Sequence, residues 1–312
     1  MWVSMNSLDS IIASISYIED YLTEKIDLDS IASAVHYSKF HLHHIFTDTV
    51  GLTIHDYIKR RKLTEAAKLL VFSDKTIMEI ALLAGYESQQ AFSGVFKVMY
   101  KQSPLKFRRN EVFYPLQLEY KFNNYPESNT EKQSMARELR YASEADITIW
   151  MDLVRLVIDG FPNLIEEEHI KVLRQSIAMC GALIMTEGNL AIGIMLISYT
   201  TGSIDFLGVH PLYRKQGIAA AFLERAISEL LEHKDISITT FREGDKADTG
   251  YRIALKELGF AEAELLTEFG YPTQKMIILN KGRHVGKYEY GQSTCEEPTA
   301  AGEEDRCCGE RK

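Results

Sequence analysis

The stretch IMEIALLAGYESQQAFSGVFK occupies residues 77–97 and combines two apolar patterns at helical spacing with one turn between them. Gly85 supplies the flexible backbone that a tight turn needs, and Ser88 stands where a helix N-cap is expected. The pattern predicts a short helix, a turn and a second helix over 89–99. This is the arrangement of a helix-turn-helix.

A similar pattern occurs earlier, in DSIASAVHYSKFHLHHIFTDT at residues 29–49. Here a short helix is followed by a turn, and Ser38 is the expected N-cap of a second helix over 39–49. A long helix over 54–71 joins the two units. Because residues 8–109 contain no strand-like alternation, we predict an all-α domain whose two units can contact successive segments of a DNA major groove.

Charge is distributed unevenly along the chain. The 312 residues carry 35 Lys and Arg against 44 Asp and Glu, and the net charge of -9 taken alone argues against a nucleic-acid partner. Residues 1–110, however, hold 13 basic and 12 acidic residues, and residues 51–110 hold 11 and 5. The basic residues therefore cluster on the helical part, and the acidic excess lies beyond residue 110.

These helical segments can now be compared with a known family. SKFHLHHIF at 38–46, GLTIHDYIKRRKLTEAAKLL at 51–70, the stretch at 77–97 and SPLKFRR at 103–109 resemble the DNA-binding domain of the AraC/XylS family, most closely its MarA, SoxS and Rob subgroup. The resemblance implies a transcriptional regulator that binds double-stranded promoter DNA, with RNA polymerase as a further partner.

The resemblance also implies, position by position, which residues lie against DNA: Lys39, Phe40, His43 and His44 in the first recognition helix, Gln89, Gln90, Ser93 and Gly94 in the second, and Arg61 and Lys97 as phosphate contacts. The subgroup typically has Gln-Arg in place of His43 and His44, and Arg in place of Gly94. Each arginine pairing with guanine contributes about 1–3 kcal/mol of discrimination. The operator sequence therefore does not carry over, and the histidines could pair with guanine, contact phosphate or stay solvated.

Beyond the helical domain, composition and length predict further parts. With 46% hydrophobic and 25% charged residues the chain has a globular composition, and its length suggests two folded domains. We expect a DNA-binding domain over 1–110, a polar linker over 111–136, a second domain over 137–281 and a disordered tail over 282–312.

Several classes of protein are not expected. No run of about 18 uninterrupted apolar residues occurs, because Glu187, Gly188 and Asn189 interrupt the most apolar region. Neither a membrane span nor a secretory signal is expected, which makes the cytoplasm the expected compartment. The cysteines show no disulfide or zinc-site spacing, so no metal site is predicted; the vicinal Cys307 and Cys308 either belong to a disordered tail or bind a soft metal.

In the second domain, helical and strand patterns alternate, which predicts a mixed α/β sheet. The informative stretch is IDFLGVHPLYRKQGIAAAFL at 204–223, where a strand and a turn lead into a helix. Backbone N–H groups at that helix N-terminus, the small Gly217 and the positive charge of Arg214 form a candidate anion site of a size for pyrophosphate.

This stretch, together with Leu258-Gly259-Phe260, resembles the CoA-binding motif of the GNAT N-acetyltransferase superfamily over residues 137–281. The resemblance implies that acetyl-CoA or another acyl-CoA binds as substrate or regulatory ligand. Its pyrophosphate would contact Arg214, Lys215, Gln216, Gly217, Ile218 and Ala219, and its pantetheine would lie along Leu207, Gly208 and Val209. The predicted fold class is thus multidomain, an all-α double helix-turn-helix domain followed by an α/β GNAT-like domain.

The catalytic residues match this family less well. It often has Asn, Ala and a general-acid Tyr where this chain has Asp248, Tyr251 and Leu255. Leucine cannot protonate a thiolate. Tyr251 could substitute from one turn earlier or simply pack, and Asp205 is the nearest candidate base. We therefore expect a regulator that senses acyl-CoA or another small ligand; the alternatives are an active N-acetyltransferase acting on an amine, and a domain that has lost CoA binding.

Overall fold

The computed structural model describes residues 7–121, 136–157, 165–198, 200–230, 234–268 and 270–279. The tail predicted over 282–312 and most of the predicted linker lie outside these residues. Within the described part of the chain, no helix has the length and apolar character needed to cross a membrane.

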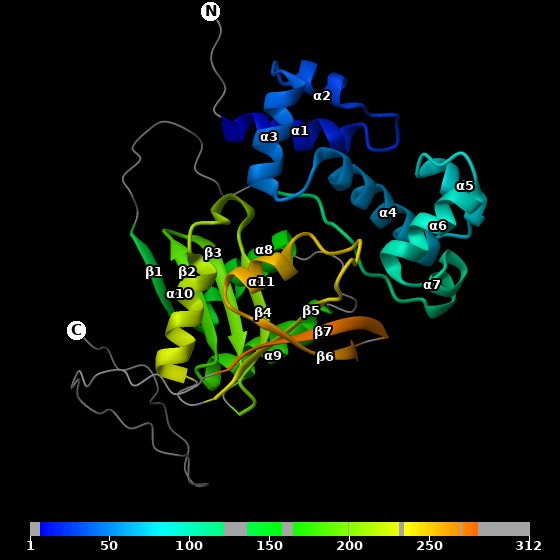
Figure 1. Cartoon of the computed structure of the whole chain (residues 1–312). Helices are drawn as coiled ribbons and strands as arrows, with labels where there is room; N and C mark the ends of the chain where they lie inside the picture. Colours follow the sequence, from blue (N-terminus) through cyan, green and yellow to red (C-terminus); the bar gives the residue numbers. More distant parts are fainter. Residues whose placement is uncertain are drawn as a thin grey trace, which may run out of the picture. The chain divides into compact units, whose positions relative to one another are not determined.

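Residues 7–121 form the helical domain (Figure 1). Its helices are α1 (Ser7–Asp20), α2 (Leu28–Ala34), α3 (Lys39–Val50), α4 (Ile54–Phe72), α5 (Ile77–Leu83), α6 (Gln89–Tyr100) and α7 (Pro104–Asn110). The Ser38 side chain accepts a hydrogen bond from the His41 N–H at the start of α3, and Ser88 accepts one from the Ala91 N–H at the start of α6. Both predicted helix-turn-helix units are confirmed, α2 with α3 and α5 with α6.

Helix α4 contributes to two separate cores. Its first half packs with the first unit, in a core that includes Ile11, Ile31, Leu42, Phe46 and Tyr57. Its second half packs with the second unit, in a core that includes Leu63, Ala67, Ile80, Phe92 and Phe96. Because one continuous helix carries both halves, the two units share a rigid connection.

The segment after α7 differs from a free linker in its described part. Within residues 111–121, the side chains of Tyr114, Leu116, Gln117 and Tyr120 are buried. The Thr64 hydroxyl on α4 accepts hydrogen bonds from the N–H groups of Leu116 and Gln117, at 3.0 and 3.1 Å. This part of the predicted linker is therefore packed along the helical domain.

The second domain is built on a seven-stranded sheet in the order β1-β2-β3-β4-β5-β7-β6. Its strands are β1 (Arg137–Tyr141), β2 (Ala182–Glu187), β3 (Leu190–Ile197), β4 (Ser203–Val209), β5 (Ile236–Phe241), β6 (Ala261–Glu268) and β7 (Tyr271–Ile278). Every neighbouring pair is antiparallel except β4 and β5, which are parallel. The mixed α/β fold expected from the sequence is confirmed.

Helices cover both faces of this sheet (Figure 1). The helices are α8 (Ile147–Val157) and α9 (Glu166–Ala178) on one face, and α10 (Ile218–Arg225) and α11 (Tyr251–Glu257) on the other. Short helical turns are η1 (Glu144–Asp146), η2 (Pro211–Tyr213) and the π-helical η3 (Ala226–Leu230). The turn η2 lies between β4 and α10, directly before the predicted anion loop at 214–219.

Candidate functional site

The exposed face of α3 carries the residues expected to contact DNA. Phe40 is 80% exposed, although it is a large apolar side chain. His43 and His44 are also exposed, while Leu42 and Phe46 on the other face are buried in the core. Lys39 makes a solvent-exposed ion pair with Asp29. The exposed aromatic and polar side chains of the first recognition helix therefore take no part in packing the core.

Helix α6 likewise has one exposed face and one buried face. Gln89, Gln90 and Lys97 are exposed and Ser93 is half-buried, whereas the phenylalanines of the helix lie in the core. A Cβ added to Gly94 would meet no atom within 4 Å, so this position is open. Polar side chains at the N-terminal end of a helix are those that a helix-turn-helix presents to base edges.

Arg61 does not lie on this exposed surface. Its side chain is 7% exposed, and its Nε and Nη2 donate to the carboxylate of Glu19 at 2.8 and 2.7 Å. Its Nη1 donates to the Gln117 carbonyl, and Glu65 accepts a further hydrogen bond from Nη2. The expectation that Arg61 contacts phosphate is therefore corrected, because its guanidinium is buried and committed to partners within the helical domain.

The predicted anion loop has the backbone geometry that such a site requires. Lys215 and Gly217 both have positive φ, +60° and +78°, and α10 begins directly after Gly217. A Cβ built on Gly217 would meet nothing within 4 Å, so space is open in front of the helix N-terminus. Left-handed residues in a loop that ends at a helix N-terminus turn N–H groups into a concave anion site. The pyrophosphate site at this loop stays a prediction.

Side chains of this loop already have partners. The Arg214 Nη1 donates to the backbone carbonyl of Val50 at 2.6 Å. Gln216 accepts a hydrogen bond from Arg137 at 2.5 Å and donates to the Leu212 carbonyl at 3.1 Å. Gln216 is therefore oriented from β1, whereas Arg214 is directed toward the end of α3.

The backbone predicted to hold pantetheine lies on β4. Leu207, Gly208 and Val209 pair with β3 on one side, whereas β4 pairs with β5 only at Ser203 and Ile204 within the described residues. The two parallel strands thus part after Ile204. The edge of β4 that faces β5 is left with unpaired ladder positions over the residues where the resemblance places the ligand.

The candidate catalytic residues do not form an acid-base set. Leu255 is 4% exposed and packs in the core beneath the sheet. The Tyr251 hydroxyl donates to the Val157 carbonyl at 3.5 Å, a long hydrogen bond that links α11 to the end of α8. Asp205 is exposed on β4. The resemblance predicts a general-acid tyrosine at position 255, and the chain has a packed leucine there.

His210 lies directly after β4 and is buried. Its Nδ1 accepts a hydrogen bond from the Leu212 N–H at 3.2 Å, which fixes the turn into η2. Burial, and to a smaller degree the positive charge of Arg214, lowers the pKa of His210 to about 4. The imidazole is therefore neutral at pH 7. In the sequence His210 follows a strand and precedes Pro211, and neither neighbour indicates that the imidazole is buried.

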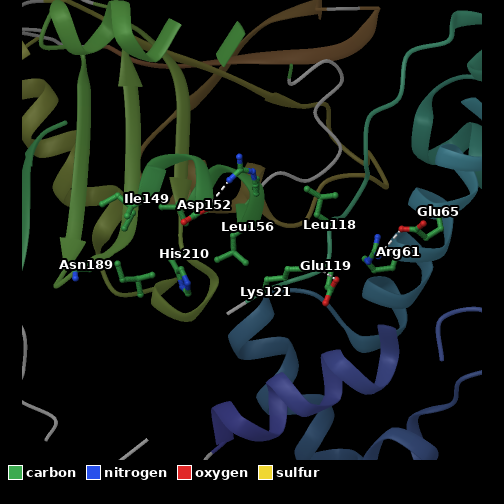
Figure 2. Close-up of a pocket in the computed structure, with 14 residues that line it drawn as sticks. Arg61, Glu65, Leu118, Glu119, Lys121, Ile149, Asp152, Leu156, Asn189 and His210 are labelled. Carbon is green, nitrogen blue, oxygen red and sulfur yellow. Dashed lines mark hydrogen bonds and ion pairs between the residues drawn. The ribbon is translucent and has the colours of Figure 1, made fainter. Parts of the chain in front are cut away.

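The same histidine lines a cavity of about 500 Å³ (Figure 2). The lining residues are Arg61, Glu65, Leu118, Glu119, Lys121, Ile149, Asp152, Leu153, Arg155, Leu156, Asn189, Leu190, Ala191 and His210. They come from α4, the segment before residue 122, α8, the start of β3 and the end of β4. Sequence reasoning missed this cavity, because its walls are far apart in the chain.

Comparison with known proteins agrees with this geometry. Residues 31–110 match the model of a helix-turn-helix domain. The chain is 45% identical over 87 residues to the probable transcription factor PqrA of Proteus vulgaris, and the match covers 28% of this chain and 71% of PqrA. The chain belongs to the AraC-type helix-turn-helix family.

A second relative of this AraC-type chain is YbfP of Bacillus subtilis (strain 168), an uncharacterized HTH-type transcriptional regulator. It is 41% identical over 95 residues, which are 30% of this chain and 32% of YbfP. The helix-turn-helix model matches residues 31–110, a range that includes α3, α4, α5 and α6, so this assignment includes both recognition helices.

The second domain of the AraC-type chain matches a different family model. Residues 150–260 match the acetyltransferase (GNAT) family model, which spans α8 through Phe260 and includes the anion loop. A solved acetyltransferase of the GNAT family from Bacillus cereus ATCC 10987 aligns with 46% of this chain and 97% of its own length, at 15% identity and a TM-score of 0.37. The family models thus match an AraC-type helix-turn-helix domain over residues 31–110 and a GNAT-type domain over residues 150–260.

Proposed function

We propose that the chain binds promoter DNA through α3 and α6 and senses acyl-CoA through its GNAT-type domain. As an AraC-type protein it is a DNA-binding transcription regulator. The observation that carries the sensing role is the loop at 214–219, which has two left-handed residues and open space at Gly217. A ligand sensor must bind its ligand but does not need to convert it. A loop suited to an anion, without a matched acid and base beside it, agrees with that role.

The ligand would be held in two places. N–H groups of the loop and the Arg214 guanidinium would contact the pyrophosphate, with charge-assisted hydrogen bonds supplying most of the affinity. The edge of β4 over residues 207–209 would hydrogen-bond the pantetheine amides. When bound, an acyl-CoA supplies an activated thioester, and the residues of the loop and of β4 would orient it. The two candidates for proton transfer are Tyr251, whose hydroxyl contacts the Val157 carbonyl, and Asp205, which is exposed.

Calorimetric titration of the full chain with acetyl-CoA tests this role. The matched pair Gly217→Glu and Gly217→Gln introduces the same backbone strain and nearly the same volume, but only glutamate adds a negative charge at the pyrophosphate. We expect binding by the wild type, weaker binding by Gly217→Gln and none by Gly217→Glu. Equal binding by the two variants would place the ligand elsewhere.

DNA binding is tested separately, with the full chain and the DNA upstream of its own gene at several salt concentrations. A sequence-dependent complex that weakens as salt rises is expected, because phosphate contacts release counterions. If the alternative of an active N-acetyltransferase is correct, thiol release from acetyl-CoA in the presence of amines will accompany binding. The buried Leu255 leads us to expect binding without turnover.

A further inference from the structure

The anion loop of the GNAT-type domain contacts the end of the first recognition helix. The Arg214 Nη1 donates to the Val50 carbonyl at 2.6 Å, and Val50 is the last residue of α3. The carboxyl end of a helix carries unsatisfied carbonyls and a partial negative charge. The arginine expected to bind pyrophosphate therefore already binds a weaker anionic partner within the same chain.

Gly51 lacks a side chain at the place where the Arg214 guanidinium approaches the end of α3. This residue ends α3 with φ +78°, and its N–H donates to the Thr47 carbonyl. A Cβ added to Gly51 would lie 2.3 Å from the Arg214 Nη1. Any side chain at position 51 must therefore push the guanidinium away from the end of α3.

The second helix-turn-helix unit is held at a different place. Lys101, which ends α6, pairs with the buried Asp245 at 2.6 Å, and the Arg60 Nη2 on α4 donates to the Ala247 carbonyl at 2.7 Å. These contacts involve the loop before α11 and not the anion loop. Loss of the Arg214 contact would remove the hydrogen bond between the anion loop and α3, while α4 and α6 keep theirs. The apolar packing of Leu42, Phe46 and Val50 in the core shared with α8 would remain.

We propose that acyl-CoA and the carboxyl end of α3 compete for Arg214, so that ligand binding breaks the hydrogen bond between the anion loop of the GNAT-type domain and the end of the first recognition helix. This inference rests on the proposed acyl-CoA site. A pyrophosphate carries more negative charge than a helix end, but the helix end has the advantage of a high effective concentration. The apparent affinity for acyl-CoA is then reduced by the fraction of molecules in which Arg214 is engaged by α3.

The experiment is calorimetry of the full chain with acetyl-CoA, using Gly51→Asn to break the contact without changing the loop. Asparagine tolerates the left-handed conformation, so the end of α3 is retained. The matched control is Gly85→Asn, also at positive φ in a helix-turn-helix turn but adjacent to the flexible end of Lys62. We expect Gly51→Asn to bind about fivefold or more tightly than wild type, a typical size for coupling between sites, and Gly85→Asn to match wild type.

A double-mutant cycle identifies Arg214 as the shared residue. In the Arg214→Ala background, Gly51→Asn should leave acetyl-CoA affinity unchanged. Hydrogen exchange on the wild type gives a readout without any substitution at Gly51: amides at the end of α3 should exchange faster when acetyl-CoA is added. Binding with equal affinity in wild type and Gly51→Asn, or with no change in exchange, overturns the competition alone; absence of acetyl-CoA binding in every chain overturns the proposed sensing function as well.

Discussion

Arg61 on α4 and Glu19 on α1 form a bidentate ion pair in which both partners are largely buried. The Tyr57 hydroxyl donates to the same carboxylate at 2.9 Å, and burial, reinforced by the charge of Glu19, raises the pKa of Tyr57. The hydrogen bonds and charge of Glu19 likewise raise the pKa of Arg61 despite its burial. One carboxylate thus holds α1 against α4 in the first helix-turn-helix unit.

Replacing Glu19 by Gln should therefore destabilise the helical domain strongly. Breaking a buried ion pair leaves an uncompensated charge and costs about 3–5 kcal/mol. The measurement is the urea dependence of helical circular dichroism. Glu65→Gln is the matched control, because Glu65 also pairs with Arg61 but is 44% exposed, and its loss should cost about 1 kcal/mol or less. Equal effects of the two substitutions would contradict the assignment of Glu19 as the principal partner.

Local features of the fold were predictable from the sequence because they depend on neighbouring residues. Ser38 and Ser88 cap the two recognition helices as expected, since a capping hydroxyl needs a donor only three residues away. Gly85 has the positive φ that its place in a tight turn suggested. The burial of Arg61 was not predictable in this way. A run of four basic residues does not tell which of them turns toward a buried carboxylate on another helix.

Contacts over long sequence distances were also beyond prediction. Val50 and Arg214 meet across 164 positions, and no local pattern in either segment refers to the other. Each domain was assigned its role from the resemblance to a separate family. Because neither family pattern includes the other domain, contacts between the two domains could not be predicted from these patterns. The cavity lined by His210 and Arg61 was missed for the same physical reason, because its walls come from both parts of the chain.

Gln90 and Lys97 on α6 are expected to contribute to DNA binding in different ways. Gln90→Ala should reduce affinity for the preferred site by about 1–3 kcal/mol and leave non-specific binding unchanged, because a glutamine contacts a base edge. Lys97→Ala should weaken binding to all sequences and reduce the salt slope by about 1, since a lysine contacts phosphate. Fluorescence anisotropy at several salt concentrations measures both. A salt slope that changes with Gln90→Ala but not with Lys97→Ala would reverse the two assignments.

His210 should make stability depend on pH in a defined window. Its pKa is lowered to about 4 in the folded chain, mainly by burial, whereas an unfolded histidine titrates near 6.5. The unfolded state therefore binds more protons between these values, so this contribution to stability is present above about pH 6.5 and is lost as the pH falls to 4. The loss amounts to about 3 kcal/mol.

Asparagine at position 210 offers the appropriate comparison. His210→Asn keeps an acceptor for the Leu212 N–H and removes the titrating group. Denaturant unfolding at a series of pH values should show a smaller loss of stability between pH 6.5 and 4 in the variant than in the wild type. Parallel curves for the two proteins would mean that His210 is already protonated, or equally accessible, in the folded chain.

Asp245 should couple to Lys101 in stability. The Asp245 side chain is 4% exposed and accepts hydrogen bonds from Lys101, from the Tyr271 hydroxyl and from the Ala247 N–H. Asp245→Ala removes all three and should cost about 3 kcal/mol or more. Lys101→Met should cost less, because the carboxylate keeps its two neutral donors. Since both substitutions break the same contact, the double variant should be less destabilised than the sum of the single ones, by about 1 kcal/mol or more in urea unfolding. Strict additivity would show that the end of α6 does not depend on Asp245.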